Sequence, residues 1–191
     1  NMLYVTTDKG GARIEALSLS DPVNPKVKWS SSPVSGTCYS PLTYHNGYLY
    51  TGTWNGEASG YYFCVSASNG NVVWSIADPN GFYWDGAYAS DNYVAFASEN
   101  AVGGDNEAEG SVLYTVNART GARIDAVTGL KGSIRNTVVY DNGYLYVGTV
   151  AGRLYRIRVD AAGHLGKSSG SNNDNFSYID LEGRIKATMV I

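Results

Sequence analysis

Hydrophobic and polar residues alternate in short segments along the whole chain, and no segment carries the sustained apolar stripe of an amphipathic helix. The segments are bounded by glycine, asparagine, aspartate and serine, which favour turns. The 23 glycines and 16 tyrosines agree with many tight turns and many aromatic strand positions. The pattern therefore predicts an all-β chain.

One repeated segment organises these alternating stretches. "GTCYSPLTYHNGYLYTG", which starts at Gly36, aligns without a gap with "GSIRNTVVYDNGYLYVG", which starts at Gly132. "GFYWDGAYASDNYVAFA" from Gly81 follows the same frame with fewer identities, and "GRIKATMVI" from Gly183 is the first half of a fourth copy. The second half of that copy is "NMLYVTTDKGG" at the N-terminus, so one repeat is divided between the two ends of the chain.

Each repeat contains four predicted strands. They are 37–44, 48–53, 61–67 and 72–76 in the second unit, 84–89, 93–98, 111–118 and 123–127 in the third, and 133–140, 144–149, 153–159 and 176–181 in the fourth. The first unit takes 184–191 from the C-terminus and 2–7, 12–19 and 26–31 from the N-terminus.

Tandem four-stranded units with a period of about 45 to 50 residues predict the blades of a β-propeller. We expect one domain over 1–191, with blades at about 184–191 plus 1–33, 34–79, 80–128 and 129–182. A β-sandwich is the competing fold, but it would predict neither the matching repeats nor the complementary chain ends.

Several segments resemble the repeats of pyrroloquinoline-quinone-type, or quinoprotein-like, β-propellers. They are "GYLYVGTVAGRLYRIRV" (143–159), "YFCVSASNGNVVW" (62–74) and "LYTVNARTGARI" (113–124). Trp29 and Trp74 lie where this family often has a docking tryptophan, and Asp125 replaces it in the third blade. The resemblance covers nearly the whole chain and implies the fold. It also implies an extracellular, cell-surface or periplasmic location.

The number of blades differs between this chain and the family that it resembles, because such propellers usually have seven or eight blades and this chain supplies four. Three alternatives follow. The chain closes alone, with its terminal strand completing the first blade. Two chains form an eight-bladed homodimeric ring, each giving its last strand to the other. Or the chain is a piece of a longer propeller. We favour the two-chain ring.

Composition and charge exclude some classes of partner. A formal charge of -3 does not indicate the positively charged surface that binds nucleic acid, so we expect no nucleic-acid partner. No apolar run approaches the length of a membrane span.

The two cysteines, Cys38 and Cys64, are expected on the first and third strands of the second unit, with one strand between them. Two strand spacings amount to about 10 Å, which exceeds the roughly 7 Å that a disulfide can bridge. We therefore predict that both cysteines are free.

A candidate binding surface lies at the mouth of the predicted channel, where the innermost strands begin. Three residues after the aligned glycines come Tyr39, Trp84, Arg135 and Lys186, and one place further along the third unit comes Asp85. The adjoining loops and links add Trp54 and Tyr83. Aromatic rings with a few charged groups suit a small anionic, sugar-like or peptide ligand. The alternative is that these positions face solvent in any propeller and need no ligand.

The loop after the second strand of the third unit is acidic, with Asp105, Glu107 and Glu109 as weak candidates for calcium ligands. They lack the spacing of a known calcium loop, so a solvated loop is the alternative. We expect no resident cofactor.

Three function classes remain. A quinone-dependent dehydrogenase-like enzyme is disfavoured, because the adjacent cysteines and the acidic and amide ligands that the resemblance would require are missing. A repeat segment of a larger surface protein, with no function of its own, is the second alternative. We expect a non-catalytic binding or scaffold propeller, whose partner is a protein, a peptide or a glycan.

Overall fold

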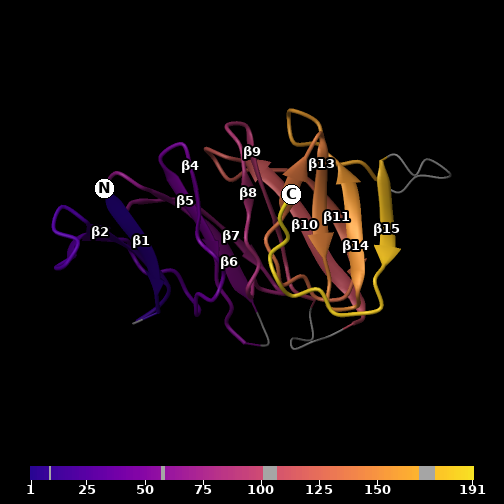
Figure 1. Ribbon diagram of the computed structural model, residues 1–191, viewed down its shortest axis with the longest axis horizontal. Coiled ribbons are helices and arrows are strands. Elements are labelled where there is room, and N and C mark those ends of the chain that lie inside the picture. Colours follow the sequence, from indigo (N-terminus) through magenta and orange to yellow (C-terminus); the bar gives the residue numbers. More distant parts are fainter. Residues whose placement is uncertain (9, 57–58, 101–106, 168–174) are drawn as a thin grey trace.

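The computed structural model describes residues 1–8, 10–56, 59–100, 107–167 and 175–191. Within these residues, fifteen strands form four antiparallel sheets, which follow one another in chain order (Figure 1). We call each sheet with its turns a blade. This arrangement confirms the prediction of an all-β chain built from propeller blades.

The strands of each blade are consecutive in sequence and in space. The first blade contains β1 (Met2–Thr7), β2 (Arg13–Ser18) and β3 (Lys26–Ser30), and the second contains β4 (Thr43–His45), β5 (Tyr48–Gly52), β6 (Gly60–Ser66) and β7 (Val72–Asp78). The third contains β8 (Tyr88–Ala89), β9 (Tyr93–Ala97), β10 (Glu109–Asn117) and β11 (Arg123–Lys131). The fourth contains β12 (Val139–Asp141), β13 (Tyr144–Gly148), β14 (Arg153–Arg158) and β15 (Phe176–Asp180).

The repeated Asn-Gly pairs form the hairpins between the two inner strands of the second and fourth blades. Asn46 and Gly47 have φ of 44° and 84°, and Asn142 and Gly143 have φ of 46° and 85°. Two consecutive residues with positive φ make a type I′ turn, whose twist matches that of the flanking strands. The sequence repeats this pair because asparagine and glycine tolerate that conformation best.

The faces of neighbouring blades pack together through large apolar side chains. Ile14 and Phe63 are fully buried and belong to one cluster, to which the first and second blades contribute. Tyr62 of the second blade stacks on Phe96 of the third, with ring centroids 4.0 Å apart. Leu113 of the third blade belongs to a further cluster, most of which comes from the third and fourth blades. These interfaces form the core of the protein, because each blade buries its face against the next.

The docking tryptophans suggested by the resemblance connect each blade to the next. A side chain on Gly70 would collide with the Trp29 ring, and one on Gly121 would collide with the Trp74 ring. Trp74 Nε1 also donates a hydrogen bond of 3.0 Å to the carbonyl of Ala118 in the third blade. Asp125 replaces the tryptophan with a polar contact, since its carboxylate accepts a 2.9 Å hydrogen bond from the Leu165 amide of the fourth blade.

The innermost strands are shorter than predicted. β4, β8 and β12 include only the last residues expected for 37–44, 84–89 and 133–140. The earlier residues of these segments turn toward the loops at the rim. Thr37, for example, exchanges two backbone hydrogen bonds with Trp54, at 2.9 and 3.0 Å. The backbone pairing of each innermost strand with the next strand therefore starts only where the contacts with the loops end.

The expectation that residues 184–191 complete the first blade of the same chain was wrong. The first blade has three strands, and the C-terminal residues that were expected to complete it form no strand. Instead, the Ile185 amide donates a 3.0 Å hydrogen bond to the Thr149 carbonyl, which holds this segment on the fourth blade. The first and fourth blades lie at opposite ends of the row of sheets in Figure 1, so the four blades form an open arc.

Both cysteines are free, as predicted. Cys64 is buried within β6, and the Cys38 thiol lies 3.2 Å from the hydroxyl of Thr51 on β5. Burial raises the pKa of both thiols, to about 12 for Cys64. The described part of the chain has no helix long and apolar enough to cross a membrane.

Candidate functional site

Four aromatic residues converge where the second and third blades meet, and we call them the aromatic surface. Tyr83 is its centre: its ring centroid lies 5.2 Å from that of Tyr39, 5.1 Å from that of Trp54 and 4.4 Å from that of Trp84. Tyr39 and Trp84 remain 50% and 41% exposed, so their rings are available to a ligand. The structure thus brings together four residues that the sequence analysis selected from three separate segments.

A buried ion pair lies beneath this surface. The Arg135 guanidinium carbon is 4.9 Å from the Tyr83 ring centroid and 5.5 Å from that of Trp84, which allows cation–π attraction. Arg135 also donates hydrogen bonds to both carboxylate oxygens of Glu99, at 2.8 and 3.3 Å. The side chains of Arg135 and Glu99 are only 7% and 1% exposed. Arg135 therefore supports the rings from within, in contrast to the expected solvent-facing cation.

Glu99 was missed by the sequence analysis. In the aligned frame Glu99 stands where the first unit has Asp8, the second unit has Trp54 and the fourth unit has Val150, so the repeat gives no signal for a buried ion pair at this position. Its partner, Arg135, lies 36 residues further along the chain.

Trp84 has an unusual backbone conformation. Its φ of 66° lies in the left-handed region, which bulky side chains rarely adopt. Stacking on Tyr83 and the contact with Arg135 hold the ring in place despite this strain. Strained residues of this kind cluster at functional sites, which favours a role for the Trp84 ring in binding.

Asp85 follows Trp84 and points into the protein. It is completely buried, and neither carboxylate oxygen has a hydrogen-bond partner among the described residues. Burial raises the pKa of Asp85 well above its usual value, and the nearby Glu99 contributes in the same direction. The neighbouring Tyr62 hydroxyl is likewise buried without a partner. Burial therefore favours the protonated form of Asp85.

The raised pKa of Asp85 makes the stability of the protein depend on pH. Below the unfolded-state pKa of about 3.8 both states carry the proton. Between that pH and the raised pKa of the folded state, the unfolded chain loses the proton while the folded chain retains it, so this contribution to stability declines as pH rises. We expect Asp85→Asn to match the unaltered protein near pH 4. At pH 8 it should be more stable, by about 1.4 kcal/mol for each unit by which folding raises the pKa of Asp85.

Urea unfolding of both proteins at several pH values measures this difference, in which the titration of all other groups cancels. A difference that does not change with pH would contradict the assignment of a proton to Asp85.

The remaining candidate residues lie apart from the aromatic surface or are held by other contacts. Lys186 is exposed on the segment after β15, one repeat beyond Arg135. Glu107 pairs with Arg184 at 3.4 Å, and Glu109 is the first residue of β10. Asp105 lies outside the described residues. Among those described, no group of three His, Cys, Asp or Glu side chains is arranged to hold a metal ion.

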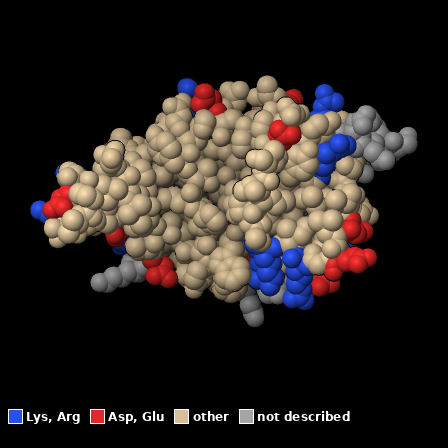
Figure 2. All heavy atoms as spheres, viewed as in Figure 1, with Lys and Arg blue, Asp and Glu red and all other residues tan. Residues whose placement is uncertain are grey.

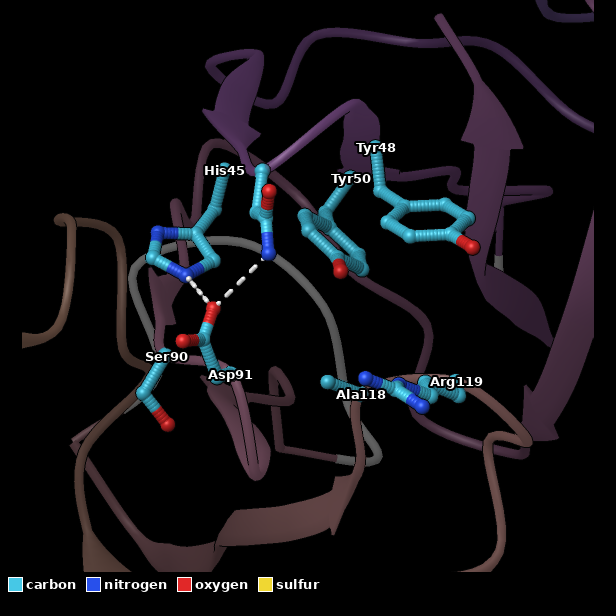
Figure 3. A pocket seen from close by; sticks show the side chains of 8 residues that line it. His45, Tyr48, Tyr50, Ser90, Asp91, Ala118 and Arg119 are labelled. Atoms are coloured by element: carbon cyan, nitrogen blue, oxygen red, sulfur yellow. Dashed lines mark hydrogen bonds and ion pairs between the residues drawn. The ribbon is translucent and has the colours of Figure 1, made fainter.

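A polar pocket of about 270 Å³, which the sequence analysis missed, lies at the opposite ends of the second and third blades (Figure 3). His45 Nε2 is 2.8 Å from Asp91 Oδ1, and Asn46 donates a 3.1 Å hydrogen bond to the same oxygen. This contact lowers the pKa of Asp91. Ser90 also lines the pocket, but its hydroxyl donates to the Tyr93 carbonyl at 2.9 Å and points away from the imidazole in Figure 3. The pocket therefore contains no assembled Ser–His–Asp triad.

Figure 2 shows how charges are distributed over one face. Lys and Arg side chains occur in small groups near the edge, and a broad central area is uncharged. This face has no continuous basic patch of the kind that nucleic-acid binding requires.

Comparisons with protein-family models and with curated protein sequences found no match. Solved structures do resemble the chain. BamB from Moraxella catarrhalis is 19% identical with a TM-score of 0.62, over 87% of this chain and 45% of that one. Quinohemoprotein alcohol dehydrogenase from Comamonas testosteroni is 13% identical with a TM-score of 0.65, over 96% and 34%. Sqt1 from Chaetomium thermophilum, bound to the N-terminus of the ribosomal protein L10, is 14% identical with a TM-score of 0.66, over 98% and 48%.

The chain has the fold of a β-propeller segment. It spans less than half the length of each of these three proteins. Both a dehydrogenase and a protein bound to a partner are among them, so the shared fold does not decide between catalysis and binding.

Proposed function

We propose that this chain is a non-catalytic binding module whose aromatic surface engages a polypeptide partner. The observation that carries this proposal is the exposure of Trp84 and Tyr39 above a base formed by Tyr83, Arg135 and Glu99. Aromatic side chains on a rigid base bind partners well, because little conformational freedom is lost on contact.

The residues at this surface favour recognition over chemistry. Arg135 is engaged by Glu99, and burial keeps Asp85 away from solvent. Quinone-dependent chemistry would need adjacent cysteines and a set of metal ligands. Cys38 and Cys64 are not adjacent, and the described residues offer no such ligand set. The residues present therefore do not fit a quinone and its metal.

A polypeptide is the preferred ligand class. Tyrosine and tryptophan are enriched at protein interfaces, where they combine a large apolar area with a polar group. The likeness to Sqt1, which was solved with a bound protein segment, supports the same choice by analogy of fold. We further propose that the module acts outside the cytoplasm, as the resemblance to quinoprotein-like repeats implies.

Selection of a random-peptide library displayed on phage provides a direct test. We expect enriched peptides to bind the unaltered chain and to bind Trp84→Ala about 30-fold more weakly, which corresponds to a hot-spot loss of about 2 kcal/mol. The matched control is Tyr44→Ala, because Tyr44 is 60% exposed on β4, away from the aromatic surface. The melting temperature of each variant is measured alongside the affinity.

The outcomes separate the alternatives. Peptides that bind Trp84→Ala as well as the unaltered chain, or no enriched peptides at all, would overturn the proposal. A parallel glycan array addresses the other ligand class, and glycan binding that depends on Trp84 would replace the polypeptide by a sugar.

A further inference from the structure

Each ring of the aromatic surface carries one polar group, and none of these groups has a hydrogen-bond partner among the described residues. They are the hydroxyls of Tyr39 and Tyr83 and the indole nitrogens of Trp54 and Trp84. The groups on Trp54 and Tyr83 are accessible to solvent, since neither belongs to the buried polar atoms that lack a partner. An indole nitrogen can only donate a hydrogen bond, and a phenol hydroxyl donates readily. The surface therefore combines apolar rings with unused hydrogen-bond donors.

The charges next to these rings are buried. Arg135 is paired with Glu99, and its guanidinium already faces the rings of Tyr83 and Trp84. A positively charged ligand would be repelled by this guanidinium, and the carboxylates of Asp85 and Glu99 are too deeply buried to attract it. A negatively charged ligand gains little from a guanidinium that is 7% exposed and bound to a carboxylate. The part of a ligand that contacts the rings is therefore uncharged.

The rings are fixed in place as separate faces. Trp54 exchanges two backbone hydrogen bonds with Thr37, and a side chain on Gly81 would lie 2.9 Å from the Trp54 ring. Tyr83 contacts the rings of Tyr39, Trp54 and Trp84, whereas no ring contact joins those three to one another. A ligand that carries several small flat groups can therefore use more than one of these faces at once.

We propose that the polypeptide engaged by the aromatic surface is a proline-rich segment in the polyproline II conformation. This inference rests on the proposed binding function and specifies its ligand. Proline has a compact apolar ring and a carbonyl group, but no backbone N–H. A polyproline II helix makes no internal hydrogen bonds, so all its carbonyl oxygens are free to accept. Such a segment is uncharged, apolar and rich in acceptors, which complements the rings and donors of the surface.

The stiffness of the segment favours the same ligand. A proline-rich segment is already extended before it binds, so little conformational entropy is lost when it meets a rigid surface. Aromatic-lined grooves bind such segments in unrelated folds for this reason.

A glycan fits this surface less well. Sugar hydroxyls donate hydrogen bonds as well as accept them. The carboxylates of Asp85 and Glu99 would be strong acceptors for those donors, but both are buried. A surface whose available polar groups mainly donate is therefore better matched by the carbonyl groups of a polypeptide.

Titration calorimetry of the unaltered chain with short peptides tests the ligand class. One probe is an oligoproline with an acetylated N-terminus and an amidated C-terminus, so that it carries no charge. The matched control is a blocked peptide of the same length with alternating glycine and serine. We expect the oligoproline to bind about tenfold more tightly, because the flexible peptide must lose conformational freedom and cannot cover the rings.

Two conservative variants test the role of the donors. Tyr39→Phe and Trp54→Phe each retain an aromatic ring but lose the polar group. We expect each variant to bind the oligoproline about fivefold more weakly, as is usual for the loss of one hydrogen bond. Tyr44→Phe is the matched control, since it removes the hydroxyl of an exposed tyrosine on β4, and it should bind as the unaltered chain does. Melting temperatures measured alongside show that each variant is folded.

The results separate this inference from the binding function on which it rests. Library peptides that bind through Trp84, without any binding of the oligoproline, would overturn the proline-rich ligand and leave the polypeptide-binding function intact. No peptide binding that depends on Trp84 would overturn both. Oligoproline binding that is unchanged in Tyr39→Phe and in Trp54→Phe would contradict the role of the donors. Tighter binding of a blocked trimethyl-lysine peptide than of the oligoproline would contradict an uncharged ligand.

Discussion

Replacing Arg135 with alanine is expected to destabilise the protein by about 3–5 kcal/mol, because the change leaves the buried carboxylate of Glu99 without its partner. Glu99 is only 1% exposed, so water cannot readily replace the guanidinium. The aromatic surface would also lose the cation beneath the rings of Tyr83 and Trp84. Urea unfolding with an unchanged m value measures the loss.

A paired control distinguishes an isolated charge from a general packing defect. Changing Arg135 to methionine and Glu99 to leucine together removes both charges and retains apolar volume, and should recover most of the lost stability. An Arg135→Ala protein as stable as the unaltered chain would contradict the buried pair. This variant is consequently a poor probe of ligand binding, for which Trp84→Ala is the cleaner choice.

Replacing Phe96 with alanine is expected to cost a similar amount, about 3–5 kcal/mol, because it opens a cavity between the second and third blades. The Phe96 ring stacks on Tyr62 at 4.0 Å and packs edge-on against Phe82 at 5.5 Å. All three side chains are fully buried. Thermal or urea unfolding measures the effect.

Phe96→Leu is the matched control for that cavity, since it retains most of the volume and should cost clearly less. If the alanine and leucine variants were equally stable, the interface between these blades would have to repack around the missing ring. That result would contradict a rigid contact of Phe96 with Tyr62 and Phe82.

The sequence predicted the regular parts of the fold because they arise from local chemistry. Asn-Gly at 46–47 and 142–143 can form the required turn within a few residues. The docking positions of Trp29 and Trp74 were also predictable, because the first and second repeats carry the same contact. The aromatic surface was found in part: Tyr39, Trp54, Tyr83 and Trp84 do converge.

The burial of the charged candidates could not be predicted. Arg135 and Asp85 occupy positions that face solvent in a generic propeller, yet both are buried. Arg135 pairs in the interior with Glu99, which comes from a segment 36 residues away. The pocket at His45 and Asp91 was missed for the same reason, because it joins two hairpins that are 46 residues apart.

By itself, the sequence determined the all-β class, the four repeats and the hairpins at 46–47 and 142–143, since periodicity and turn chemistry act over short distances. Only the tertiary structure decided which side chains lie buried beneath the aromatic surface and where residues 184–191 lie. Contacts between blades control both, through the hydrogen bond from Ile185 to Thr149 and the ion pair of Arg135 with Glu99. Such contacts join residues far apart in the chain, and no local pattern encodes their geometry.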